Sequence, residues 1–137
     1  MKNSICLDTG IITQFYSKEP PRDIIVLMNN VKKNDYNCKI LYPILVEAYY
    51  HMCKFLGKIG AETRIASFIE KYPVNLVNLN KSLIFKAGEL KCQYSNSLSY
   101  NDCIIIAYAL NKKITIHTTE KGLNKLFPTL KLKEYLF

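Results

Sequence analysis

Short apolar runs alternate along this sequence with longer segments in which apolar residues recur every three or four positions. The short runs are rich in Ile, Leu and Val, a composition and length typical of strands buried in a sheet. They predict β-strands at residues 4–7, 39–42, 74–79, 114–117 and 130–135. No internal repeat, linker or low-complexity segment interrupts the pattern.

The longer segments predict helices, and proline and glycine mark several of their ends. Pro43 opens one helix, Gly57 ends it, and Pro73 ends the next. The predicted helices are residues 11–16, 22–33, 43–55, 61–71, 81–94, 99–109 and 122–127. Alternation of this kind favours a three-layer α/β/α sandwich with a central parallel sheet, formed by a single domain over residues 1–137.

The composition indicates a folded domain in a reducing compartment. The chain has 137 residues, of which 49% are hydrophobic, which is enough for a core and excludes a disordered chain. No apolar run approaches the ~18 residues that cross a bilayer, and residues 1–7 lack the pattern of a signal peptide. The five cysteines lie in apolar contexts without a C-x-x-C pair. We therefore expect buried thiols rather than a zinc site, and a cytoplasmic protein.

The balance of charge favours an anionic partner. The chain has 19 Lys and Arg against 11 Asp and Glu, a net charge of +8. Nucleic acid is the first candidate for such a partner. The lysines are spread along the chain rather than clustered, so a solvated basic surface explains the charge equally well.

The tripeptide Asp8-Thr9-Gly10 is also found at the active sites of aspartic proteases. Those proteases consist almost entirely of strands, and a second aspartate comes from another such tripeptide or from a dimer mate. Here one such tripeptide stands in a helix-rich pattern. A tripeptide without its structural context is weak evidence, so the protease hypothesis is set aside.

Four acidic residues differ from the other seven in their surroundings. Asp8, Glu47 and Asp102 sit in apolar runs, where an ionised carboxylate is costly unless it is paired. Glu120 follows the strand predicted at residues 114–117. Each of the four comes at a predicted strand end or in the first turn of a helix. We therefore expect all four at the carboxyl edge of the sheet, where open parallel sheets bind ligands.

Each of these acids also has a purely structural interpretation. Asp102 and Ser99 form a capping-box pattern, Asp8 is placed to cap the helix that follows it, and Glu47 and Glu120 would suit a helix dipole. Two carboxylates ~4 Å apart, however, repel by about 4 kcal/mol at an effective dielectric constant of ~20. A cluster of four therefore favours a bound divalent cation, and oxygen-only ligands favour Mg²⁺ or Mn²⁺.

Four segments in this order resemble a PIN-domain protein, and the size of the chain is similar to that of VapC-type toxins. The segments are residues 5–9, 45–47, 98–107 and 116–120. The resemblance covers almost the whole chain and implies a parallel sheet between helices, a PIN-like fold. It also implies metal-dependent hydrolysis of RNA, with Mg²⁺ or Mn²⁺ as cofactor. The residues that match the catalytic and metal-binding acids are Asp8, Glu47, Asp102 and Glu120.

The resemblance extends to residues around the acids and also shows departures. Thr118 matches a threonine that orients the first aspartate, and Thr9 is a second residue placed to hydrogen-bond a carboxylate. The sequence has Glu120 where the family usually has Asp, Leu123 where an aromatic residue is common, and Gly10 where a small polar residue is frequent. The longer side chain of Glu120 bears on whether a second ion binds.

The expected chemistry is metal-assisted attack of water on phosphorus. The resemblance implies products with 5′-phosphate and 3′-hydroxyl ends. Lys121, beside the acids, and Lys54 are candidates for contacts with RNA phosphates. We expect His51 to contact Glu47 within its helix and His117 to have a packing role.

The resemblance also implies partners, and it leaves several hypotheses open. The implied partners are a protein antitoxin and a second copy of the chain in a homodimer. The alternatives to a toxin are a housekeeping PIN nuclease for RNA processing and a non-catalytic PIN-like binding module. A small neighbouring open reading frame would favour the toxin, and absence of metal binding would favour the binding module. A phospho-acceptor domain that uses Asp8 fits the order of the acids poorly.

Overall fold

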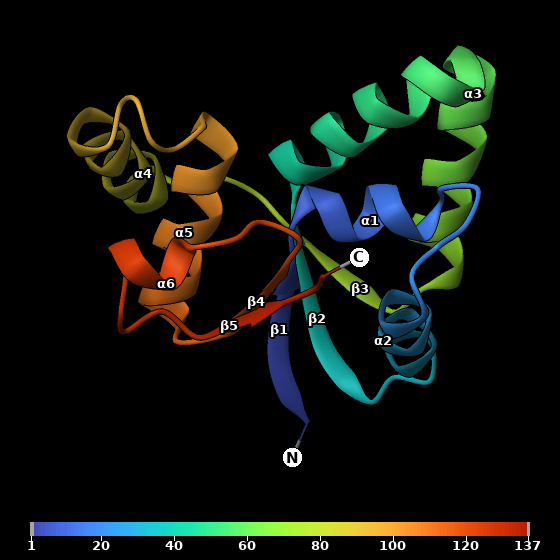
Figure 1. The fold of residues 1–137 in the computed structure, drawn as a ribbon, viewed down its shortest axis with the longest axis horizontal. Coiled ribbons are helices and arrows are strands. Elements are labelled where there is room, and N and C mark those ends of the chain that lie inside the picture. Colours follow the sequence, from blue (N-terminus) through green and yellow to red (C-terminus); the bar gives the residue numbers. More distant parts are fainter. Residues whose placement is uncertain (1, 137) are drawn as a thin grey trace.

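A five-stranded parallel sheet forms the centre of the computed structural model, which describes residues 2–136 (Figure 1). The strand order is β3-β2-β1-β4-β5, and every pair of neighbours is parallel. The strands are β1 (Asn3–Leu7), β2 (Tyr36–Leu41), β3 (Val74–Val77), β4 (Thr115–Thr118) and β5 (Leu132–Glu134). The predicted parallel sheet between helices is confirmed.

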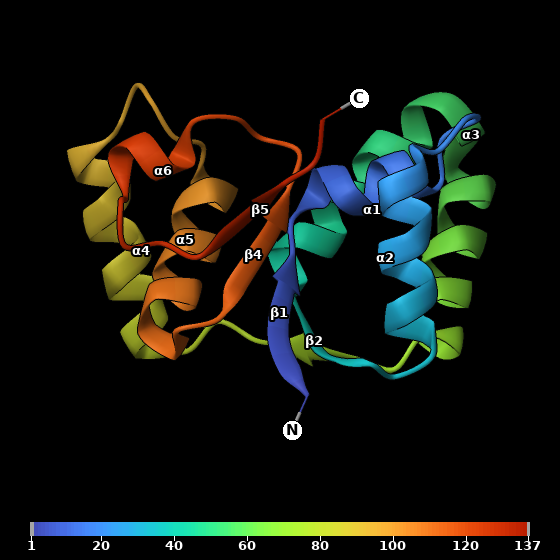
Figure 2. The same ribbon diagram turned by 60° about the horizontal axis from the view of Figure 1, so that its bottom comes forward.

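Helices cover both faces of the sheet. One face carries α1 (Thr9–Phe15), α2 (Arg22–Lys32) and α3 (Tyr42–Lys71). The other carries α4 (Lys81–Gln93), α5 (Tyr100–Lys112) and α6 (Leu123–Leu126), as Figures 1 and 2 show from two directions. No helix in the described range 2–136 is both long and apolar enough to cross a membrane.

The central strand β1 brings the first candidate acid to the carboxyl edge. Ile5, Cys6 and Leu7 are at most 2% exposed, because helices cover the strand on both faces. The backbone N–H of Asp8 donates to the carbonyl of His117 at 3.0 Å. The ends of β1 and β4 therefore lie side by side, with Asp8 next to the end of β4.

Several element boundaries differ from the predicted ones. β2 begins at Tyr36 rather than at residue 39, because Tyr36 and Asn37 pair with the start of β1. β3 ends at Val77, before Leu79. At Gly57 the backbone has φ of 77°, a left-handed value that glycine adopts without strain, and this residue kinks α3 where the sequence predicts a break.

The cysteines are less uniformly buried than predicted. Cys6, Cys38 and Cys103 are buried, but Cys53 is half-buried and Cys92 is exposed, so the expectation of five buried thiols is wrong for these two. All five are free thiols. A reducing compartment remains a prediction.

Candidate functional site

Asp8 is held in place by two hydrogen bonds at the end of β1. Its Oδ1 accepts from the backbone N–H of Thr9 at 2.8 Å, which caps α1. Its Oδ2 accepts from the hydroxyl of Thr118, at the end of β4, at 2.8 Å. The side chain is only 6% exposed. Asp8 is therefore both a helix cap and a buried carboxylate with a fixed orientation.

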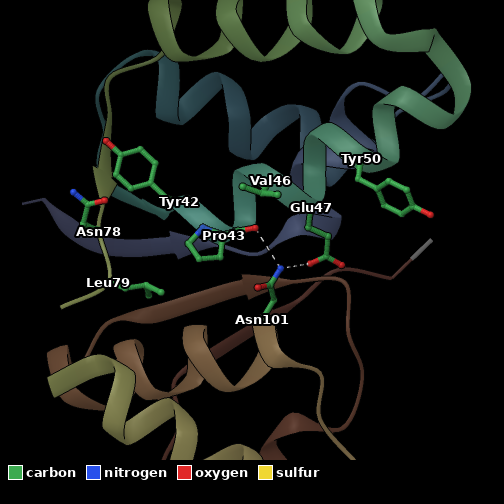
Figure 3. A pocket seen from close by; sticks show the side chains of 8 residues that line it. All are labelled: Tyr42, Pro43, Val46, Glu47, Tyr50, Asn78, Leu79 and Asn101. Carbon is green, nitrogen blue, oxygen red and sulfur yellow. Dashed lines mark hydrogen bonds between the residues drawn. The ribbon is translucent and has the colours of Figure 1, made fainter. Parts of the chain in front are cut away.

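Glu47 in α3 is held by residues from two other elements. Its Oε1 accepts from the hydroxyl of Thr9 at 2.9 Å and from the side-chain amide of Asn101 at 2.7 Å. The same amide donates to the carbonyl of Pro43 at 3.3 Å (Figure 3). Asn101 thus ties the first turn of α5 to the start of α3. Sequence reasoning gave Asn101 no role, and the only signal for one was its place beside Asp102.

Asp102 and Glu120 form the other side of the cluster. Asp102 completes the predicted capping box, because its Oδ2 accepts from the N–H of Ser99 at 3.0 Å and its own N–H donates to the Ser99 hydroxyl at 3.1 Å. The N–H of Glu120 donates to the Thr118 hydroxyl at 3.0 Å. The charge of Asp102 raises the pKa of Glu120, so the two carboxyl groups are near neighbours.

Two carboxyl groups of the cluster, those of Asp8 and Glu120, have raised pKa values. Burial raises the pKa of Asp8, the hydrogen bonds from Thr118 and Thr9 lower it, and the charges of Asp102 and Glu47 raise it. Burial, the charges of Asp102 and Asp8, the hydrogen bond with Asp102 and the charge of Glu47 raise the pKa of Glu120 to about 7. Glu120 is exposed, so water moderates this upward shift.

No basic side chain compensates this cluster within residues 2–136, apart from the imidazole of His51. Its Nε2 lies 3.7 Å from Oε2 of Glu47, one turn earlier in α3, and its Nδ1 is 3.3 Å from the Thr13 hydroxyl. The contact with Glu47 agrees with the predicted intrahelical role, whereas the contact with Thr13 joins α3 to α1. His117 is buried, with Nδ1 2.7 Å from the Tyr135 hydroxyl, which agrees with a packing role.

The donor set suits a hard divalent cation in its chemistry. All four candidate ligands are carboxylates, and Asp8 and Asp102 are only 6% and 7% exposed. In the part of the chain that the structure describes, no three His, Cys, Asp or Glu side chains are already arranged to hold an ion. The four carboxylates would therefore have to draw closer together to hold a cation.

A cavity of about 610 Å³ opens beside Glu47 (Figure 3). Its wall combines Glu47 and Asn101 with the apolar and aromatic side chains of Tyr42, Val46 and Tyr50. Tyr50 is 58% exposed and Val46 is 71% exposed. The carboxylate edge is therefore bordered by an open surface that suits flat, partly apolar groups.

The sequence adds a family assignment to this geometry. Residues 5–126 match the PIN domain family. The chain belongs to the PIN domain family. The chain matches none of the curated protein sequences.

Solved structures show the same PIN fold at low sequence identity. The complex VapBC2 from Rickettsia felis, bound to a DNA fragment from its promoter, aligns with a TM-score of 0.74 and 20% identity, covering 97% of this chain and 99% of that one. DNA-bound VapBC from Salmonella typhimurium gives 0.72 and 18%, covering 98% of each chain. VapC20 of Mycobacterium tuberculosis, a toxin that cleaves the sarcin-ricin loop, gives 0.66 and 15%, covering 82% and 86%. At these identities the likeness establishes the fold.

Two of the three positions at which this PIN domain departs from the usual family pattern have structural explanations. Leu123 is 3% exposed at the start of α6, so an aliphatic side chain fills that place in the core. A Cβ at Gly10 would lie only 1.9 Å from the Thr119 hydroxyl oxygen. The Thr119 side chain thus occupies the space of a side chain at position 10, beside the segment that carries Thr118 and Glu120.

Gly10→Ala is expected to destabilise this PIN domain by about 1–3 kcal/mol, because a close-packed site must open to admit the methyl group. Adding Thr119→Ala should recover most of this loss, since it removes the atom in closest contact. The free energy of unfolding from urea titrations measures both effects.

The matched control is Gly88→Ala in α4, where a Cβ would meet nothing within 4 Å. This change should stabilise the protein by roughly 0.5–1 kcal/mol, because alanine favours a helix. A Gly10→Ala protein as stable as the wild type would show that Thr119 moves aside freely.

Proposed function

We propose that this PIN domain is a Mg²⁺- or Mn²⁺-dependent endoribonuclease that hydrolyses phosphodiester bonds of RNA, and that it is the toxin of a toxin–antitoxin pair. The observation that carries the proposal is the gathering of Asp8, Glu47, Asp102 and Glu120 at one edge of the sheet without a Lys or Arg partner within residues 2–136. Membership of the PIN family and the neighbours' assignment as toxins support it.

The four carboxylates would hold the metal ion, with Glu120 at the side where a second ion or an oriented water would lie. A bound ion supplies activation of water and stabilisation of the charge that develops on the phosphate. The protein's own contribution is orientation. Thr118 fixes Asp8, while Thr9 and Asn101 fix Glu47. Hydrogen bonds of this kind hold metal ligands in one rotamer.

The cavity beside Glu47 would receive unpaired bases of the RNA. Tyr42 and Tyr50 present aromatic surfaces there, and aromatic side chains stack on bases with little dependence on sequence. The ammonium group of Lys54 lies 4.7 Å from the centre of the Tyr50 ring, which brings positive charge to the rim. Lys121 follows Glu120 directly and is the second candidate for a phosphate contact.

A protein antitoxin and a homodimeric state belong to the same proposal. Solved relatives of this fold are toxin–antitoxin complexes from Rickettsia felis, Salmonella typhimurium and Klebsiella pneumoniae. In this chain Phe55 and Ile59, on either side of the kink at Gly57, are 50% and 81% exposed. Apolar residues exposed together suit a protein interface. Such a pair would act in the cytoplasm.

Cleavage of a labelled single-stranded RNA tests the enzymatic part. Purified protein should cut the RNA with Mn²⁺ or Mg²⁺, lose the activity in EDTA and leave 5′-phosphate and 3′-hydroxyl ends. Metal-induced stabilisation without cutting would mean that RNA of this kind is the wrong substrate. Neither cutting nor metal-induced stabilisation would contradict the proposal and favour a binding module.

A further inference from the structure

Lysines from three separate parts of the chain surround one cavity at the amino edge of the sheet. The cavity has a volume of about 560 Å³. Its wall includes Lys2 before β1, Lys112 and Lys113 at the end of α5, and Lys131 before β5. The sequence shows these lysines as scattered, but the parallel topology places all of them at the end of the sheet opposite the carboxylates.

The positive charge of this cavity is not balanced by acids. No Asp or Glu is among its lining residues, and no lysine forms an ion pair within the described residues 2–136. His117, which also lines it, is neutral at pH 7, because burial and the charge of Lys133 lower its pKa to about 4. The charge therefore comes from the lysines alone.

Lys133 extends the positive charge from the cavity toward the carboxylate edge. It lies on β5, two residues after Lys131, which comes just before the strand and whose carbonyl accepts from the N–H of Ile116 on β4. Residues i and i+2 share one face of extended backbone. Its register partner is His117, one residue before Thr118 on β4. Lys131 and Lys133 thus form a short basic path along the edge strand.

The carboxylate cluster and the lysine cavity are separated by the length of several nucleotides, not of one. Asp102 and Lys113 lie at opposite ends of α5, and a rise of ~1.5 Å per residue separates them by roughly 16 Å. A group held at the cavity therefore cannot be the phosphate that is cleaved. A ligand that reaches both places must be a chain that carries regularly spaced negative charges.

We propose that the cavity formed by Lys2, Lys112, Lys113 and Lys131, with Lys133 leading to it, binds the phosphodiester backbone of the RNA substrate away from the cleaved bond. This inference rests on the proposed function for the identity of the substrate. Backbone contacts of this type add affinity without reading sequence. The enzyme would therefore prefer RNA long enough to reach both the carboxylates and the cavity.

The test compares Lys112→Gln/Lys131→Gln with the control Lys18→Gln/Lys71→Gln, which removes the same charge from exposed lysines that do not line the cavity. Lys113 stays in place because its left-handed backbone, with φ of 58°, caps α5. We would measure the binding of two RNAs, one of ~16 and one of ~4 nucleotides, in EDTA over a range of salt concentrations. These lengths are the upper and lower ends of the usual site sizes of proteins that bind single strands. Single-stranded DNA of the same sequence forms a further arm.

The cavity variant should lower the slope of log affinity against log salt for the long RNA by about 1.4, since each phosphate contact to a single strand contributes ~0.7. In Mn²⁺ it should leave cleavage of the short RNA unchanged, because that RNA is held at the carboxylates without reaching the cavity. In cleavage assays KM for the long RNA should rise with kcat unchanged, because a remote contact acts on binding alone. The control should match the wild type in every measurement.

Equal salt-dependence slopes for the cavity variant and the control variant would overturn the inference. A protein that binds the single-stranded DNA but not the RNA of the same sequence would overturn it as well. A wild type that binds long RNA through these lysines but cleaves none would uphold the cavity and refute the nuclease. A wild type that cleaves RNA with no difference between the variants would uphold the nuclease and refute the cavity.

Discussion

Asp8→Asn is expected to reduce metal-dependent cleavage of RNA by at least about 100-fold. The change removes one charged oxygen ligand from the centre of the carboxylate cluster. Metal-assisted stabilisation of the transition state contributes several kcal/mol, and each 1.36 kcal/mol lost is tenfold in rate. The measurement is the single-turnover rate on a labelled single-stranded RNA with saturating Mn²⁺.

The fold should survive this substitution. The amide oxygen of Asn can still accept from the N–H of Thr9, and the amide nitrogen can donate to the Thr118 hydroxyl, which is free to rotate and accept. The substitution also removes a buried charge next to Asp102 and Glu47. The metal-free variant should therefore melt no lower than the wild type, so that lost activity cannot be attributed to unfolding.

Asp35→Asn is the matched control, because Asp35 is an exposed carboxylate in the turn before β2. Its cleavage rate should equal that of the wild type. Cleavage by Asp8→Asn at the wild-type rate would place the chemistry elsewhere on the molecule or in a contaminating nuclease.

The general position of the acids could be predicted from the sequence, because the relevant signals are local. Asp8 interrupts an apolar strand and Asp102 follows a capping serine, and both patterns are visible within a few residues. A parallel sheet then brings strand ends to one edge. The same topology predicts Glu47 and Glu120 at this edge.

Contacts between distant segments could not be predicted in this way. Asn101 and Glu47 are 54 residues apart, and nothing in either neighbourhood indicates their hydrogen bond. The approach of Thr119 to Gly10 likewise depends on the packing of β4 and the residue after it against the start of α1. The start of β2 was missed because Asn37 looks like a loop residue, while its amide in fact bonds the Ser4 hydroxyl of β1 at 3.3 Å. Tertiary pairing outweighs local propensity here.

The stability of the metal-free protein is expected to fall as the pH rises from about 4.5 to about 7. The pKa of Glu120 is raised to about 7 and that of Asp8 is raised as well, so in this window the folded chain holds protons that the unfolded chain has lost. When the folded state binds more protons, stability decreases with pH. Urea titrations at several pH values, with EDTA present, measure the effect.

Glu120→Gln isolates the contribution of this carboxyl group. The difference in the free energy of unfolding between wild type and Glu120→Gln should depend on pH. The wild type should become less stable relative to the variant as the pH rises toward 7. The control Glu89→Gln alters an exposed carboxylate in α4 and should leave the pH dependence unchanged. Identical pH dependence in all three proteins would show that Glu120 titrates as an ordinary surface group.

At pH 7 and above, addition of Mn²⁺ should restore the stability that the metal-free protein loses as the pH rises. At a concentration of ~100 Kd, binding to the folded state alone stabilises it by about 2.7 kcal/mol. For a domain of this size that corresponds to a rise in Tm on the order of 10 °C. The rise should be smaller at pH 5, where protons compete for the same carboxylates, and smaller in Asp8→Asn. A rise of equal size at both pH values would show that the ion binds elsewhere, because a site made of these coupled carboxylates must exchange protons for metal.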